Sequence, residues 1–168
     1  MAEDEVILNA VLTVAEEALN NFIEMRTAEG ERLLNDVKSR LKFILEKVEF
    51  IEKRSPETVN IYKNRIEQKV KELLEDTTID EQRILTEVAI FADKVAVAEE
   101  TVRLRSHIQQ FESLLTDEQP VGRKLDFIVQ EMNREANTIG SKAQDIEIAH
   151  TVVDIKSEIE KIREQIQN

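Results

Sequence analysis

The sequence predicts an all-α fold: a helical bundle with a long antiparallel, coiled-coil-like hairpin. Three observations predict it. Aromatic residues make up only 4% of the 168 residues, and the chain has three Gly and two Pro, fewer than turn-rich β proteins use. Hydrophobic residues (41%) and charged residues (35%) are mixed along the chain, as in helices with one buried face. Apolar residues also recur at steps of three and four, the helical period.

The hairpin is predicted over residues 5–76. Its first helix, residues 5–53, contains no Pro and a single Gly, and its apolar residues at 33, 37, 41, 44, 48 and 51 follow a coiled-coil spacing. The run RSPET at 54–58 predicts a break, because Ser55 can cap a helix and Pro56 suits the first turn of the next one. A second helix from residue 59 is then expected to fold back on the first.

Three helices are predicted over residues 80–168, and the whole chain, 1–168, is interpreted as one helical domain. Thr78 and Glu81 fit a capping box ahead of a helix that continues to residue 115. The run TDEQPVG at 116–122 is the clearest loop, and another helix follows it.

The last helix is expected after Gly140, with Ser141 and Gln144 as its cap. Apolar residues at 148, 152, 155, 159, 162 and 166 give it a regular stripe. An opening helix this long is hard to cover with so small a bundle. We therefore expect another copy of the chain or a further domain to cover it.

Composition excludes several classes of protein. The absence of Cys rules out disulfides and thiolate metal sites, and the start MAEDEVIL has no signal-peptide pattern. We expect no apolar run to approach the ~20 residues of a membrane span, so a soluble, cytoplasmic protein without a membrane partner is predicted. The net charge of −12 argues against simple electrostatic binding of nucleic acid. Any RNA bound must be compensated by a metal, a local basic patch or another domain.

One candidate site lies on the helix over residues 80–115. Asp93, Glu100 and His107 are seven residues apart and share a stripe, with Arg103 between the last two. A carboxylate and an imidazole at this spacing can ligate a divalent metal or exchange protons. The alternative is a set of ordinary surface ion pairs.

A second candidate site lies on the helix that starts at Gly122. Glu131 and Glu135 are four residues apart beside Arg134, and Asn133 and Asn137 form a matching amide pair. Carboxylates can bind a divalent ion, and amides can hold phosphate, sugar or base edges. A solvated face explains the charges but not two Asn, which are weak helix formers. Basic residues at helix starts, Arg123 with Lys124 and Lys142 after Ser141, can hold phosphate or simply accompany caps.

The residues as a set resemble the YicC/YloC-like endoribonuclease family. The resemblance is carried by MRTAEGERLLNDV (25–37), DEQRILTEVAIFADK (80–94), EETVRLRSHIQQF (99–111), GRKLDFIVQEMNREANTIGSK (122–142) and KIREQIQN (161–168). It implies a bacterial, cytoplasmic, metal-dependent endoribonuclease that uses Mn or Mg to cut RNA internally. It also implies a homo-oligomer, expected to be a hexamer, with RNA and not DNA as its partner and a role in RNA turnover and stress.

Carried onto matching positions, the resemblance assigns two groups of residues. Metal ligation and acid/base chemistry are expected from Glu87, Glu99, Glu100, His107, Glu131 and Glu135. Phosphate and ribose contacts are expected from Arg103, Arg123, Asn133, Arg134, Asn137 and Lys142. Two departures from the family pattern stand out. The α/β domain that opens family members is absent from this sequence, and Ala96 stands where Asp is common, which removes one carboxylate.

Two other functions remain open. An oligomerisation or adaptor scaffold without chemistry would use the long helices as docking surfaces. A non-catalytic binder of single-stranded RNA ranks last, because the chain has one Tyr and no Trp for stacking on bases.

Overall fold

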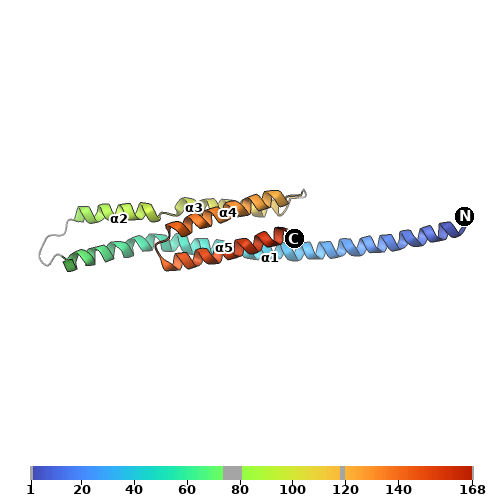
Figure 1. Cartoon of the computed structure of the whole chain (residues 1–168), viewed down its shortest axis with the longest axis horizontal. Coiled ribbons are helices and arrows are strands. Elements are labelled where there is room, and N and C mark those ends of the chain that lie inside the picture. The colour runs from blue at the N-terminus through green and yellow to red at the C-terminus, as the bar shows by residue number, and fades with distance from the viewer. Residues whose placement is uncertain (1, 74–80, 118–119, 168) are drawn as a thin grey trace. The chain divides into compact units, whose positions relative to one another are not determined.

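We describe the protein from a computed structural model, which covers residues 2–73, 81–117 and 120–167. Within these residues it consists of helices without strands: α1 (Ala2–Leu73), α2 (Glu81–Val95), α3 (Ala98–Leu114), α4 (Gly122–Lys142) and α5 (Ile146–Gln167) (Figure 1). The predicted all-α class is confirmed. The chain divides into two compact units, residues 1–38 and residues 39–168. Residues 2–38 of the first unit are helical.

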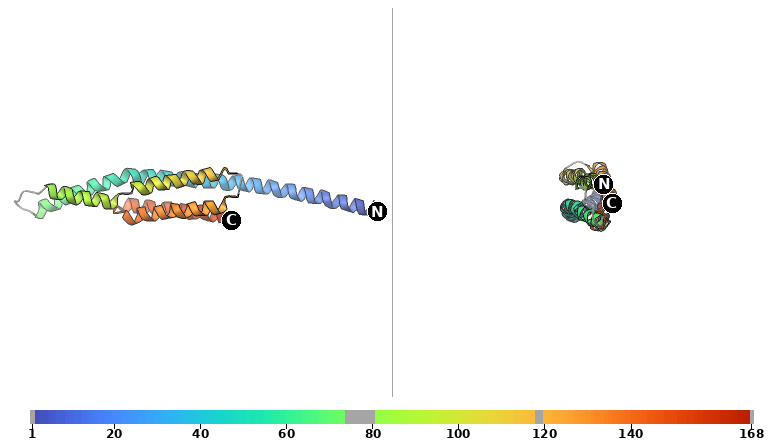
Figure 2. Two further views of the ribbon diagram at one scale, coloured as in Figure 1. Left: turned by 90° about the horizontal axis from the view of Figure 1, so that it is seen from above. Right: turned by 90° about the vertical axis from the view of Figure 1, so that its left-hand side faces the viewer.

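The second unit is an antiparallel bundle of α1 from residue 39 onward, α3, α4 and α5 (Figures 1 and 2). Ion pairs align α5 against α1, with Arg40 Nη1 2.8 Å from Glu158 Oε2 and Arg54 Nη2 2.9 Å from Asp145 Oδ2. In turn α4 packs against both α3 and α5. The core is aliphatic apart from one aromatic ring, and its fully buried side chains include Leu41, Ile44, Val48, Ile51, Leu104, Ile108, Phe111, Met132, Ile139, Ile155, Ile159 and Ile162.

A helical hairpin is present, but its second arm is not the one predicted. The rings of Tyr62 on α1 and Phe91 on α2 stack with their centroids 3.7 Å apart, so α2 lies beside the last part of α1. The hairpin is therefore formed by the last part of α1 and by α2. The capping box expected at Thr78 and Glu81 rests on Thr78, which lies outside the described residues.

The predicted break at 54–58 is wrong, because α1 continues through Pro56. A proline inside a helix removes one hydrogen bond and crowds the preceding turn. Packing on both sides compensates here. Ile51 is fully buried five residues before the proline, and Thr58, buried two residues after it, donates its hydroxyl to the Ser55 carbonyl at 2.7 Å. Tertiary contacts therefore outweigh a local signal that normally ends a helix.

The helix expected over residues 80–115 is instead two helices, separated at Ala96 and Val97. Neither Gly nor Pro marks this break, and Val97, the residue that precedes α3, has no side-chain cap. Val95 and Val97 are both buried. The break also shifts the helical phase, because a stripe continued from α2 would bury Val102, whereas Val102 is 65% exposed and Leu104 is fully buried.

The start of the last helix also differs from the prediction. Gly140 does not interrupt α4, and Asp145, rather than Ser141, caps α5: its Oδ1 accepts hydrogen bonds from the backbone N–H groups of Glu147 and Ile148, both at 3.0 Å. Gly140 has a packing role instead. A Cβ at that position would lie 3.1 Å from Cγ1 of Val152, so glycine allows α4 and α5 to approach closely.

One stretch of α1 near the N-terminus reaches the length and mean hydropathy of a membrane span, and none of its residues is buried. We expected no apolar run to approach the length of a membrane span. Judged by length and composition alone, this expectation is wrong. A single helix that passes this test is weak evidence for a membrane protein, because core helices of soluble proteins pass it too.

Candidate functional site

Two carboxylates are buried where α3 and α4 face each other. Glu100 on α3 is 4% exposed and Glu135 on α4 is 7% exposed. Burying an ionised carboxylate costs several kcal/mol unless a cation or hydrogen bonds compensate, so such residues need partners. The partners here are Lys142 and Arg103, two basic residues that were predicted to contact phosphate.

Glu100 is held by two cations. Its Oε1 accepts a hydrogen bond from Lys142 Nζ at 2.9 Å and lies 3.6 Å from Arg103 Nη2. Its other oxygen, Oε2, is buried and has no hydrogen-bond partner. Burial raises the pKa of Glu100, but the hydrogen bond from Lys142 and the charges of Lys142 and Arg103 outweigh it, so the pKa lies below its ordinary value. Glu100 is therefore a carboxylate with one free acceptor atom.

Arg103 links the two buried carboxylates. Its Nε lies 3.4 Å from Glu135 Oε2, and its Nη2 reaches Glu100 and the exposed Glu99, the latter at 3.4 Å. Lys142 has a second contact as well, because its Nζ donates to the Ala96 carbonyl at 2.9 Å. We call Glu100, Arg103, Glu135 and Lys142 the seam cluster.

His107 and Glu131 follow the same register. Arg103 contacts Glu135 across two antiparallel helices, His107 comes one turn after Arg103, and Glu131 comes one turn before Glu135. Residues four apart lie on the same side of a helix, so both side chains continue the edge that the seam cluster begins. Both are partly buried.

A shallow groove of about 520 Å³ lies on the outer face of α4, and the residues that line it are of polar types. Asn137 Nδ2 donates to Asn133 Oδ1 at 3.4 Å, so the two amides predicted as a pair do contact each other. Arg134 is largely exposed, and its Nη1 lies 3.8 Å from Glu131 Oε2. The groove is lined by amide, hydroxyl and guanidinium groups: Gln130, Asn133, Arg134, Asn137, Thr138 and Ser141.

The remaining predicted residues lie apart from the seam cluster. The helix break places Asp93 on α2, so the stripe of Asp93, Glu100 and His107 predicted on one continuous helix is wrong. Glu87 is also on α2, where it is exposed, and Arg123 is exposed in the first turn of α4.

Known proteins are similar to this chain over the helices that form the site. The domain described as "Endoribonuclease YicC-like, C-terminal" matches residues 51–168, which contain both the seam cluster and the groove. The chain belongs to the YicC-like endoribonuclease family. It is 48% identical over 168 residues to a "Probable endoribonuclease YicC" of Clostridioides difficile and 35% identical over 164 residues to one of Haemophilus influenzae. These matches cover 99% and 98% of this chain, but only 57% and 56% of the relatives.

The donors for the metal expected in a YicC-like protein are not grouped in one chain. Within the described residues, no three side chains of Asp, Glu or His are placed to hold one ion. Glu100 and Glu135 already have cations as partners, and a metal ion at either would compete with Lys142 or Arg103. The described side chains of one chain therefore do not fit a preformed metal centre.

Sequence reasoning missed Thr138 in the groove of this YicC-like chain, and it did not include Gln130 or Ser141 among the predicted site residues. A signal for them was present, because residues 130, 134, 137 and 141 recur at helical spacing on the polar side of α4. It also missed that Lys142 and Arg103 neutralise buried carboxylates, since a contact between α3 and α4 leaves no trace in local spacing.

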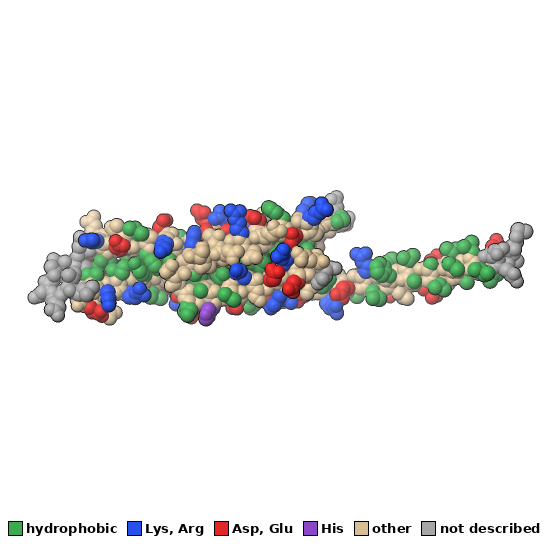
Figure 3. Space-filling model, in the orientation of Figure 1, with side chains coloured by type: hydrophobic (Ala, Val, Ile, Leu, Met, Phe, Trp, Pro, Cys, Tyr) green, Lys and Arg blue, Asp and Glu red, His purple; other side chains and the backbone are tan. Residues whose placement is uncertain are grey.

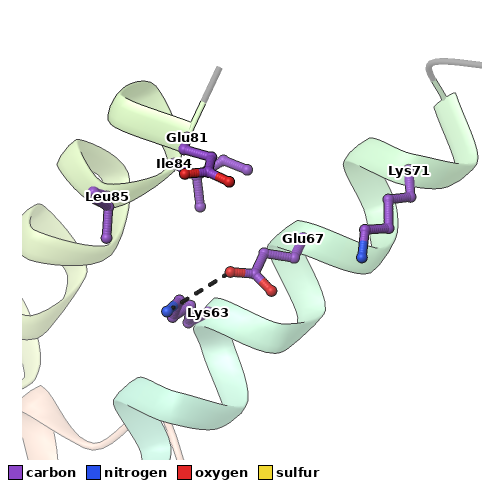
Figure 4. Close-up of a pocket in the computed structure, with 6 residues that line it drawn as sticks. All are labelled: Lys63, Glu67, Lys71, Glu81, Ile84 and Leu85. Carbon is purple, nitrogen blue, oxygen red and sulfur yellow. Dashed lines mark ion pairs between the residues drawn. The ribbon is translucent and has the colours of Figure 1, made fainter. Parts of the chain in front are cut away.

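Another hollow, of about 290 Å³, lies between the end of α1 and the start of α2 (Figure 4). Lys63, Glu67 and Lys71 line it from α1, and Glu81, Ile84 and Leu85 line it from α2. Lys63 and Glu67 form a long ion pair of 3.8 Å within α1. These are alternating surface charges over an apolar floor, and none of them belongs to the seam cluster.

Proposed function

We propose that this chain is an RNA-cleaving portion of a YicC-like endoribonuclease, with its site at the edge between α3 and α4. The observation that carries the proposal is the seam cluster, two buried carboxylates in contact with two basic side chains beside the groove on α4. Buried charged groups that are held in position by their neighbours are frequent at active sites. The residues lie in the part that matches the endoribonuclease family.

In this proposal the groove holds the RNA. Asn133 and Asn137 offer amide donors and acceptors to ribose hydroxyls or base edges, and the exposed guanidinium of Arg134 offers charge-assisted hydrogen bonds to phosphate. The groove contains no carboxylate, which matters because the whole chain carries a net charge of −12. Basic and acidic side chains are interspersed over the visible surface of residues 39–168, so attraction of RNA is local rather than global (Figure 3).

The seam cluster then supplies chemistry and positioning. Internal cleavage of RNA needs a proton taken from the attacking oxygen, a proton given to the leaving oxygen as its bond to phosphorus breaks, and charge stabilised on the phosphate. Arg103 is about half exposed in its side chain and can offer hydrogen bonds to a phosphate without leaving Glu135. His107 and Glu131, farther along the same edge, are assigned to proton transfer. Glu100 and Glu135 are assigned to holding Arg103 and Lys142 in place.

Dependence on Mn or Mg, assembly into a hexamer and a cytoplasmic location are part of the same proposal through the family resemblance. The ion would supply charge stabilisation at the phosphate. Because the described side chains of one chain offer no group of three ligands, no step is assigned to it here.

The test is cleavage of a short structured RNA by the purified chain, with Mn²⁺, with Mg²⁺ and with EDTA. Wild type is compared with His107→Ala and Glu135→Gln. Glu112→Gln is the matched control: it also removes one negative charge from α3, but at an exposed side chain that is assigned no role in the site. Cleavage that is lost in the first two variants and kept in the control supports the proposal. Cleavage that is unaffected by both variants would refute this site.

The alternative function, an oligomerisation or adaptor scaffold, is favoured by a different observation. Large apolar side chains along residues 6–25 are exposed and without cover. The scaffold would be favoured if the folded chain cleaves no RNA under any of these conditions. This result would have to hold both for the chain alone and for the chain joined to the part of its relatives that lies outside the match.

A further inference from the structure

The helix of residues 2–38 carries an apolar surface without a partner. Ten large hydrophobic side chains between residues 6 and 25 are each 50–71% exposed: Val6, Ile7, Leu8, Val11, Leu12, Val14, Leu19, Phe22, Ile23 and Met25. Hydrophobic side chains are visible along this helix in the space-filling view (Figure 3). Contiguous apolar surface of this kind in water marks an interaction site.

The width of this surface indicates what covers it. One row of small and large apolar residues contains 7, 11, 14, 18, 22 and 25, and a second, adjacent row contains 8, 12, 15, 19 and 23. Together they cover roughly half of the helix circumference at ~100° per residue. A two-stranded coiled coil covers only the narrower seam of its a and d positions. A second copy of the helix would leave one row in water, whereas the core of a globular domain would cover both.

The comparisons indicate which domain this is. The C-terminal family domain begins at residue 51, yet the match to the Clostridioides difficile relative covers 99% of this chain. Most residues ahead of the C-terminal domain therefore also have counterparts in that relative. A further large part of the relative, which is covered to only 57%, lies outside the match.

We infer that residues 5–28 are a docking surface for the core of the domain that precedes the C-terminal part in YicC-like proteins. The inference rests on family membership and on exposed apolar area, and it is independent of the proposed cleavage site. It makes this helix a shared element that would belong to the core of one domain and continue into the bundle of the other.

A lipid surface fits this helix less well. Its polar side carries Glu16, Glu17 and Glu24, and the first basic residue of the whole sequence is Arg26. Interfacial helices usually carry Lys and Arg on the polar side, where they are attracted to anionic lipids. An acidic polar side is repelled by such a membrane.

The experiment measures amide hydrogen exchange of residues 5–28 by mass spectrometry in two proteins. One is this chain alone. The other is a single polypeptide in which the unmatched part of the Clostridioides difficile relative precedes this chain. We expect fast exchange in the first and exchange slowed about tenfold or more in the second, because a docked helix opens less often.

Paired variants make the result specific. Phe22→Asp places a charge in the apolar stripe, and Asn20→Asp places the same charge on the opposite, polar side. In the longer protein, Phe22→Asp is expected to remove the protection of residues 5–28 and Asn20→Asp to keep it. Unchanged exchange over residues 98–167 verifies that the bundle stays folded in both.

Three results would overturn the inference. One is an equal exchange rate in the two proteins. Another is slow exchange in this chain alone, together with dimers in analytical ultracentrifugation, which would assign the surface to a second copy. The last is co-flotation of this chain with phosphatidylglycerol vesicles, which would assign it to a membrane.

Discussion

Lys142 Nζ lies 2.9 Å from Glu100 Oε1 and 2.9 Å from the carbonyl oxygen of Ala96, so one side chain at the end of α4 contacts both the break before α3 and the first turn of α3. Glu100 is almost completely buried, and its other oxygen has no hydrogen-bond partner. The lysine therefore compensates a charge that the bundle has removed from water.

Lys142→Met is expected to destabilise the chain by about 2 kcal/mol, because it leaves Glu100 buried with only the longer contact to Arg103. The expectation is below that for a fully buried pair, since Lys142 is about one third exposed. Urea unfolding followed by circular dichroism measures the change. The double variant Glu100→Gln, Lys142→Met should recover part of the lost free energy of unfolding. A double variant less stable than Lys142→Met would contradict this account.

The free energy of unfolding is expected to decrease as the pH is lowered into the acidic range. Hydrogen bonds from Lys161 and Arg40 lower the pKa of Glu158, that from Arg105 lowers the pKa of Glu52, and Lys142 and Arg103 lower the pKa of Glu100 against its burial. A carboxyl with a lower pKa in the folded protein contributes stability above its unfolded pKa, ~4.3 for Glu, and loses it as the pH falls through the folded value.

The free energy of unfolding should therefore be nearly constant from pH 7 to about pH 5.5 and then decrease steadily below about pH 5. Urea titrations at a series of pH values measure it. Glu158→Gln should be less stable than wild type at pH 7, and the difference should shrink toward pH 3. A difference that does not change with pH would show that the lowered pKa of Glu158 contributes nothing.

Gly140→Ala is expected to destabilise by about 1 kcal/mol, although alanine favours helices by about the same amount over glycine. The added Cβ would lie 3.1 Å from Cγ1 of Val152, a β-branched side chain with little freedom to move in a helix. Gly30→Ala is the matched control, because a Cβ there meets nothing within 4 Å. Melting temperatures should fall for the first and stay equal or rise for the second. A rise for both would show that α5 adapts easily.

Pro56→Ala is expected to stabilise the chain by about 1–2 kcal/mol, since α1 continues through this position and alanine restores the missing backbone donor. The gain is smaller than the full cost of proline in a helix, because proline also restricts the unfolded chain. Chemical denaturation measures the difference. A destabilised variant would mean that proline at position 56 is needed for packing against the neighbouring helices.

Core positions could be predicted wherever one helix keeps one buried face. Leu125, Ile128, Val129, Met132, Ala136 and Ile139 recur at helical spacing in the sequence, and all of them are buried in α4. The five apolar residues from Ile148 to Ile162 were likewise correct for α5. Burial by a neighbouring helix imposes the 3.6-residue period directly, so the spacing alone contains this information.

The predicted helix boundaries were wrong where contacts between distant segments determine them. Pro56 looks like a stop, and Ala96 with Val97 looks like uninterrupted helix, yet the structure has the reverse. The contacts involved join residues far apart in the chain, such as Lys142 with Ala96. The candidate site shows the same limit. The chemical types on α3 and α4 could be singled out, but the pairing of Arg103 with Glu135 across them could not.

The break between α2 and α3 has a consequence for the order in which the protein folds. Residues 81–114 contain neither Gly nor Pro, so their local preference is for one uninterrupted rod. The carbonyl of Ala96 receives Lys142 only once α4, which comes later in the chain, has docked. We therefore expect the break between α2 and α3 to become fixed late in folding, after α4 has been synthesised and has docked. Energy transfer between fluorophores on residues 85 and 110 would record when one continuous helix divides into α2 and α3.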